Sequence, residues 1–159
     1  KELVDAVLAS DKQYIVIYPN NDLGTEIILS EYHRFEGNPN FRIFPSIRFE
    51  HFLTFLKNAE FMIGNSSAGI RETCIYGIPS IDIGDRQSGR YVPEILKNIQ
   101  HVNACRSEIE GAISRIEDYR IKSQKFGNGD STKLFMDILQ QEEIWTTPIQ
   151  KQFNSLGDM

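Results

Sequence analysis

The sequence contains only two cysteines, Cys74 and Cys105, and they lie far apart. Neither has a Cys-x-x-Cys spacing or a histidine cluster near it, whereas a structural zinc site needs about four such ligands. We therefore expect no metal site and no bound cofactor. We also expect both thiols to be buried and free, in a reducing cytoplasm.

Long apolar stretches and excess positive charge are also missing. The apolar runs Tyr14–Tyr18 and Phe52–Leu56 are much shorter than the roughly 20 residues that cross a bilayer. The first residues, which have helical apolar spacing, include no secretory leader and no initiator methionine, as if the chain began inside a longer polypeptide. The formal net charge is −5. We expect a soluble, cytoplasmic protein that binds neither membranes nor nucleic acid.

Apolar β-branched and aromatic runs alternate with segments of helical spacing along the 159 residues. The expected strands are Tyr14–Tyr18, Phe41–Phe44, Phe61–Gly64, Pro79–Gly84 and Gln100–Asn103. Helices are expected at 1–10, 23–35, 49–56, 70–76, 108–119 and about 132–140, the last capped by Ser131 or Thr132. Such alternation produces right-handed crossovers between parallel strands. The fold class is therefore predicted to be α/β, a Rossmann-like three-layer sandwich with one parallel sheet.

The end of the sequence carries large apolar residues beyond the last expected strand. They are Ile144, Trp145, Ile149 and Phe153. Thr147-Pro148 is a typical cap and first-turn pair for one more helix. We expect a main domain over 1–142 and a helical tail over 143–159. This tail would pack either on a partner domain or on the surface of its own domain.

The segment Asn65–Glu72 is the strongest candidate for a ligand site. It follows an expected strand and opens a helix, the place where open α/β sheets bind ligands. Small residues there let a phosphate reach free main-chain N–H groups and the positive end of the helix dipole, and Ser66 and Ser67 add hydroxyl groups. Glu72, one turn into the helix, could accept hydrogen bonds from both hydroxyls of a ribose. The alternative is structural, with Asn65 and the serines capping the helix and Glu72 completing a capping box.

Two further loops follow expected strands at the same edge of the sheet. Asp85–Arg90 contains two arginines that could bind a diphosphate, or could simply be solvated. Pro19–Asp22 could reach sugar hydroxyls or be a plain turn. The histidines, which are His33, His51 and His101, have no evident carboxylate, serine or cysteine partner in the sequence, and we assign them no role.

At these residues the sequence resembles a known family. The motifs Phe61–Glu72, Tyr76–Pro79 and Gly84–Arg90 are similar to the C-terminal signature of UDP-N-acetylglucosamine 2-epimerases. The resemblance covers nearly the whole chain, and it includes Tyr18–Asn20 and Gly127–Gly129. Non-hydrolysing members usually have a double-glycine turn and a Gln-Glu-Glu ending in this motif. The Ser66-Ser67 pair and the Ile70–Glu72 ending instead resemble the hydrolysing branch, which acts in sialic acid and related nonulosonate pathways.

The resemblance implies a fold and a set of binding residues. The family fold is of the GT-B type, with two Rossmann-like domains and the active site between them, and this chain resembles only the C-terminal half. By resemblance, Ser66, Ser67 and Gly69 would hold the diphosphate of UDP, and Glu72 would hold its ribose. The remaining implied contacts are Ile47 with the uracil through its main chain, Phe52 nearby, and Asn20 and Arg86 at the sugar phosphate.

The resemblance also implies a reaction. UDP-N-acetylglucosamine would lose UDP by anti elimination to 2-acetamidoglucal, which adds water to give N-acetylmannosamine. No catalytic residue is expected in this half, because the family's acid/base carboxylates lie in the N-terminal domain. The isolated chain should therefore be inactive. Its implied partners are UDP, a UDP-N-acetylhexosamine and the N-terminal domain, in a homo-oligomeric enzyme. The alternatives are a domain of a GT-B glycosyltransferase and a non-catalytic nucleotide-binding module.

Overall fold

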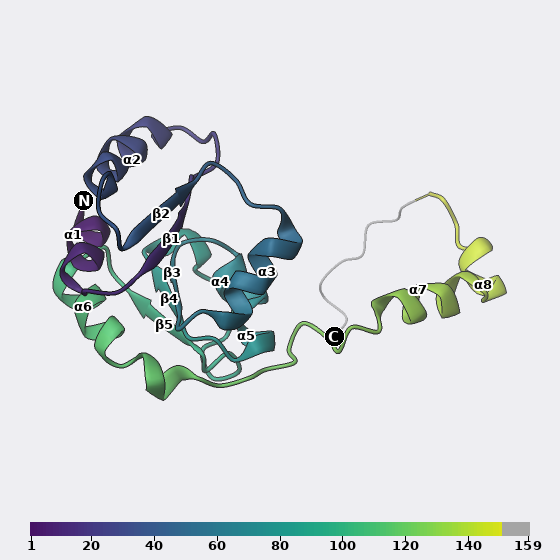
Figure 1. Ribbon diagram of the computed structural model, residues 1–159. Helices are drawn as coiled ribbons and strands as arrows, with labels where there is room; N and C mark the ends of the chain where they lie inside the picture. The colour runs from purple at the N-terminus through teal and green to yellow at the C-terminus, as the bar shows by residue number, and fades with distance from the viewer. Residues whose placement is uncertain (151–159) are drawn as a thin grey trace. The chain divides into compact units, whose positions relative to one another are not determined.

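The structure is a computed structural model that describes residues 1–150, so that Phe153 of the expected tail lies outside the described residues. The chain divides into one compact unit, Lys1–Lys125, and a second unit that begins at Phe126 (Figure 1). The first unit ends earlier than the boundary at residue 142 that the sequence suggested. Packing of the tail on another domain stays a prediction.

Every strand pair in the structure is parallel, as the alternation of strands and helices predicted. The strands are β1 (Tyr14–Ile17), β2 (Phe41–Phe44), β3 (Met62–Gly64), β4 (Ser80–Ile83) and β5 (Ile99–Val102). Each strand begins and ends within one residue of an expected strand. The α/β class is therefore confirmed.

The parallel strands form two hydrogen-bonded groups. Strands β1 and β2 form a two-stranded sheet, and β3, β4 and β5 form a three-stranded sheet in that order. Side chains join the two sheets in place of a hydrogen-bonded ladder. The Tyr14 and Phe61 rings meet edge to face with centroids 6.1 Å apart, and Ile63 packs against the buried clusters of both sheets.

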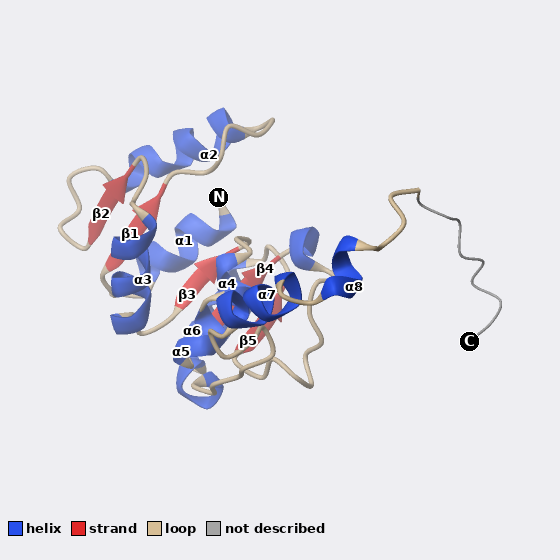
Figure 2. Cartoon of the chain, turned by 90° about the vertical axis from the view of Figure 1, so that its right-hand side faces the viewer, coloured by secondary structure: helices blue, strands red, loops and turns tan. Residues whose placement is uncertain are grey.

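Helices cover both faces of the three-stranded sheet (Figure 2). On one face α6 (Arg106–Ser114) packs on β4 and β5 and against α1 (Glu2–Ala9), and on the other α4 (Ala68–Arg71) packs on β3 and β4. The remaining helices of the first unit are α2 (Thr25–Tyr32), α3 (Phe49–Asn58) and α5 (Thr73–Tyr76), with 3-10 turns at His33–Phe35, Asp85–Gln87 and Ile116–Tyr119.

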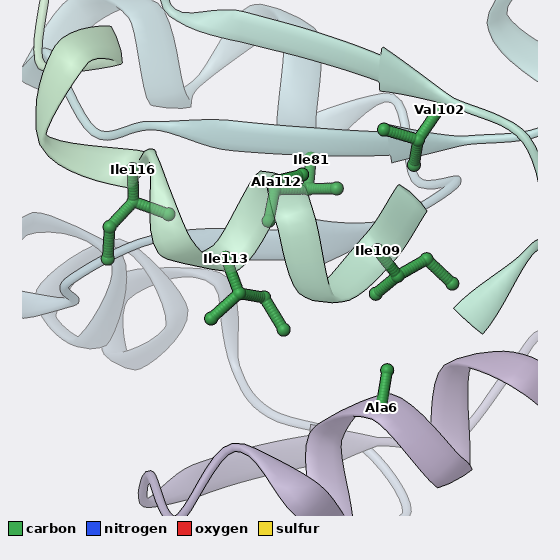
Figure 3. Close-up of a cluster of buried hydrophobic side chains, with 7 residues drawn as sticks. All are labelled: Ala6, Ile81, Val102, Ile109, Ala112, Ile113 and Ile116. Atoms are coloured by element: carbon green, nitrogen blue, oxygen red, sulfur yellow. The ribbon is translucent and has the colours of Figure 1, made fainter. Parts of the chain in front are cut away.

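The core between α1, α6 and the sheet follows the apolar periodicity of the sequence (Figure 3). Ile109, Ala112 and Ile113 of α6 and Ile116 of the following 3-10 turn have the apolar spacing of one helical face, and all four are buried. They surround Ile81 of β4, which has no exposed surface. This packing fixes one face of β4, and its other face is turned toward α4.

Two helix predictions and one cysteine prediction needed correction. The helix expected over 70–76 is split at Glu72 into α4 and α5, and it stops at Gly77 as expected, in a left-handed conformation with φ of 71°. The apolar stripe expected on 23–35 is mostly exposed, and no residue of α2 is buried. Tyr32 packs against the core from the end of α2, and Phe35 beyond it is buried. Cys105 is exposed, not buried, whereas Cys74 is buried, and both are free.

The second unit contains α7 (Ser131–Leu139) and α8 (Glu142–Trp145). Asp130, not Ser131 or Thr132, occupies the N-cap position of α7. The helix expected from Thr147-Pro148 is absent up to Gln150, where the description of the chain ends, and the short α8 precedes it. No helix within residues 1–150 has the length and apolar character needed to cross a membrane.

Candidate functional site

The turn after β3 is built by its own main chain. The Gly69 amide donates to the Ser66 carbonyl over 3.0 Å, and the Ser66 hydroxyl accepts the Ala68 amide at 3.3 Å. Ser66 therefore has the capping role that the structural alternative proposed. The N–H groups of Ser66 and Ser67, however, donate to no other group in the described chain, and both residues are exposed. These free donors suit an anion at the start of a helix.

The loop after β4 touches this turn directly. Arg86 Nη1 donates to the Asn65 carbonyl oxygen at 3.1 Å, and Gln87 Nε2 donates to the same oxygen at 2.7 Å. Arg86 is exposed and Gln87 is fully buried. The structure thus joins the loop after β4 to the turn after β3, because β3 and β4 are adjacent parallel strands that end at the same edge.

Glu72 lies at the junction of α4 and α5 and is half-buried. Its amide continues the helical pattern by donating to the Ala68 carbonyl at 3.2 Å. Its carboxylate forms no hydrogen bond or ion pair with any residue from 1 to 150, so it does not complete a capping box. A carboxylate without a protein partner at this position is free to accept hydrogen bonds from a ligand.

Gly69 has a packing role in the structure. A Cβ built on it would lie 2.7 Å from the Ser80 hydroxyl oxygen of β4, so a larger residue would have to displace this hydroxyl for α4 to lie this close to the strand. The amide of Gly69 is already bonded within the turn. Its contact with a diphosphate stays a prediction.

The other three expected binding residues lie on neighbouring segments. Phe52 is half-buried on α3, which packs against α5, and it stacks on Phe49 with centroids 6.3 Å apart. Ile47 is half-buried just before α3, and Asn20 is exposed between β1 and α2, where its carbonyl accepts the Thr25 hydroxyl. Within the described part of the chain, neither Asn20 nor Ile47 is hydrogen-bonded to the turn after β3.

A buried carboxylate near the site was missed in the sequence. Asp82 of β4 is 3% exposed and accepts the Tyr91 hydroxyl at 3.1 Å. Its neighbour in the β5 register, His101, has Nδ1 3.5 Å from the same oxygen. The statement that the histidines lack carboxylate partners was thus wrong for His101, and also for His33, which meets Glu36 at 2.6 Å. The sequence feature that could have revealed Asp82 is a single acidic residue between two isoleucines of an expected strand.

The Tyr91–Asp82 hydrogen bond should make stability depend on pH in alkaline solution. Burial, followed by the charge of Asp82 and the hydrogen bond to it, raises the Tyr91 pKa from 10.0 to about 12. The unfolded chain therefore loses this proton first, so the contribution of Tyr91 is complete below pH 10 and declines toward pH 12. We expect urea unfolding of Tyr91→Phe to show a smaller loss of stability over this interval than the unaltered chain. Equal losses would contradict the assignment.

Comparison with known proteins identifies the family. A family model described as UDP-N-acetylglucosamine 2-epimerase matches residues 1–140. The chain belongs to the UDP-N-acetylglucosamine 2-epimerase family. A UDP-N-acetylglucosamine 2-epimerase of Neisseria meningitidis serogroup B is 43% identical to it over 96% of this chain and 41% of that protein. A UDP-N,N'-diacetylbacillosamine 2-epimerase (hydrolyzing) of Legionella pneumophila is 27% identical over 96% of this chain and 39% of its own length.

A solved structure supports the fold of the epimerase family. UDP-GlcNAc 2-epimerase of Methanocaldococcus jannaschii, in complex with UDP-GlcNAc and UDP, superimposes with a TM-score of 0.70 at 21% identity, over 87% of this chain and 38% of that one. The Rossmann-like, GT-B-type assignment is thereby confirmed. The chain spans about two fifths of the length of these epimerases.

Proposed function

We propose that this chain is the UDP-binding half of a hydrolysing UDP-N-acetylglucosamine 2-epimerase. The observation that carries the proposal is the set of unpaired groups after β3. The amides of Ser66 and Ser67 and the carboxylate of Glu72 have no partner in the described chain, and Arg86 donates to the Asn65 carbonyl of the same turn. Donors for a diphosphate and an acceptor for a ribose thus lie at opposite ends of the short helix α4.

In this proposal each binding residue has a distinct task. Ser66, Ser67 and Gly69 bind the diphosphate and Arg86 faces the sugar phosphate, while the missing Cβ of Gly69 keeps α4 close to β4. Glu72 binds the ribose, the main chain of Ile47 meets the uracil with Phe52 nearby, and Asn20 faces the sugar phosphate. The Ser66-Ser67 pair and the Legionella relative, which is named as hydrolyzing, favour the hydrolysing branch.

The chemistry assigns this half a supporting role. Elimination breaks the bond between the sugar C1 and the UDP oxygen while C2 loses a proton, and water then adds across the new double bond to give N-acetylmannosamine. The departing diphosphate gains negative charge, which preorganised donors and an arginine stabilise. The groups that move protons are expected in the rest of a longer, homo-oligomeric and cytoplasmic enzyme. This chain alone should not turn over substrate.

Calorimetry with UDP, ADP and GDP tests the proposal. We expect heat of binding with UDP and much less with ADP and GDP, because the uracil contact selects the base. The affinity should be weak, since a closing domain normally adds contacts and excludes water. A chain that binds none of the three nucleotides, or all three equally, would contradict the proposal.

A further inference from the structure

Gln87 is a polar side chain that the loop after β4 buries completely. It has no exposed surface, although the residues on either side of it, Arg86 and Ser88, are exposed. Its Nε2 donates over 2.7 Å to the Asn65 carbonyl, which belongs to the turn after the neighbouring strand. A buried amide is costly unless it is hydrogen-bonded. Gln87 is therefore a fixed link between the two loops of the proposed site.

The carbonyl that Gln87 holds shares a peptide group with the Ser66 amide. Peptide groups are planar and almost always trans, so the Asn65 oxygen and the Ser66 N–H point in opposite directions in one plane. A carbonyl oxygen has two lone pairs, and here Gln87 and Arg86 each donate to it. With its oxygen held by two donors, this peptide plane has little freedom to rotate. The direction of the free Ser66 N–H is set at the same time.

The second polar atom of Gln87 is buried as well. Its Oε1 is buried and has no hydrogen-bond partner among residues 1–150. A buried acceptor left without a donor is destabilising, and an apolar side chain of similar size would avoid that cost.

We propose that Gln87 is a positioning residue that aims the Ser66 amide at the anion of the nucleotide. This inference rests on the proposed function, because the anion is the diphosphate of UDP. Gln87 itself does not touch the ligand. It acts by holding the Asn65 peptide, so that the donor is already oriented before UDP arrives.

Gln100 provides a matched control for Gln87. It is 4% exposed, its Nε2 donates to the Ala112 carbonyl at 3.0 Å, and its Oε1 is also buried without a partner in the described chain. Its acceptor lies on α6, on the opposite side of the sheet from α4. Gln87→Met and Gln100→Met thus remove the same kind of bond at two places.

Nuclear magnetic resonance tests the orientation directly in the ligand-free chain. In Gln87→Met, we expect the residual dipolar coupling of the Ser66 N–H to change and its 15N relaxation to show increased motion. In Gln100→Met, both should stay as in the unaltered chain. UDP titration should then show a loss of affinity of roughly 3- to 10-fold for Gln87→Met only, the value of one ordinary hydrogen bond. An unchanged Ser66 coupling, or an unchanged UDP affinity, would overturn the inference.

Two features of the experiment distinguish a failure of this inference from a failure of the proposed function. If the unaltered chain does not bind UDP, the proposed function fails, and the dipolar coupling still decides whether Gln87 orients the Ser66 amide. If Gln87→Met does not fold, the through-hydrogen-bond coupling between Gln87 Nε2 and the Asn65 carbonyl carbon can be measured in the unaltered chain. Its presence supports the link, and its absence overturns it.

Discussion

Replacing Glu72 with alanine is expected to weaken UDP binding by about 10- to 100-fold, because a hydrogen bond to a charged group contributes about 1.5–3 kcal/mol. The Glu72 carboxylate has no partner in the described protein, so its removal leaves no buried donor unpaired. The loss should therefore come from the ligand. Calorimetry with UDP and 2'-deoxy-UDP can locate it on the ribose, since the deoxy ligand lacks one of the two hydroxyls. Glu72→Ala should reduce the preference for UDP over its deoxy analogue.

Glu94→Ala is the matched control for this prediction. Glu94 is exposed, carries the same charge and forms no hydrogen bond or ion pair with other residues in the range 1–150. Its removal tests the general effect of one negative charge on a negatively charged ligand. We expect UDP affinity to stay unchanged or to rise slightly. If both variants behave alike, or if Glu72→Ala weakens UDP and its deoxy analogue equally, the ribose contact is wrong.

The arrangement of the elements was largely predictable because it depends on local periodicity. Runs such as Tyr14–Tyr18 are too short and too apolar for a surface helix, and the spacing of Ile109, Ala112, Ile113 and Ile116 fits one helical face. Interruption of the sheet was not predictable. It depends on whether β1 and β3 are hydrogen-bonded to each other, which they are not. The sequence does not reveal that the Tyr14 and Phe61 rings make the contact between the two sheets instead.

Some side chains could not be placed from local patterns at all. The apolar stripe on α2 predicts a buried face, yet Leu23 is wholly exposed and Ile27 is 72% exposed. Periodicity reports that a helix has an apolar face, and it does not report whether the same chain supplies the surface that covers it. The end of the chain shows the same limit, where Thr147-Pro148 is a good helix start but is not used as one before the described residues end.

The candidate site was predictable to the level of its loops. The rule that ligands bind at the carboxyl ends of parallel strands led to Asn65–Glu72 and to Asp85–Arg90, and the structure joins these segments through Asn65. The side chains that create the junction were not found. Glutamine in a polar loop gives no sign of burial, and the contact of Gln87 with Asn65 joins residues 22 positions apart.

Gly69 links the packing of the sheet to the geometry of the site, and replacing it with alanine should show which effect dominates. In a helix, alanine is more favourable than glycine by about 1 kcal/mol, so propensity predicts that Gly69→Ala stabilises the chain. The added Cβ, however, would lie 2.7 Å from the hydroxyl oxygen of Ser80, which is buried in β4. Overpacking of this kind costs about 1–3 kcal/mol. We expect the clash to dominate and urea unfolding to show a net destabilisation.

The same clash should disappear in the Ser80→Ala background, because the Ser80 Cβ lies 3.9 Å from the added methyl group, an ordinary contact. The Ser80 hydroxyl makes no hydrogen bond within the described residues, so Ser80→Ala alone should cost little. In the double variant the helix propensity of alanine remains without the clash, and Gly69→Ala should then become neutral or stabilising. A double-mutant cycle measures the coupling. If Gly69→Ala has the same effect in both backgrounds, the close approach of α4 to β4 does not explain why this position is glycine.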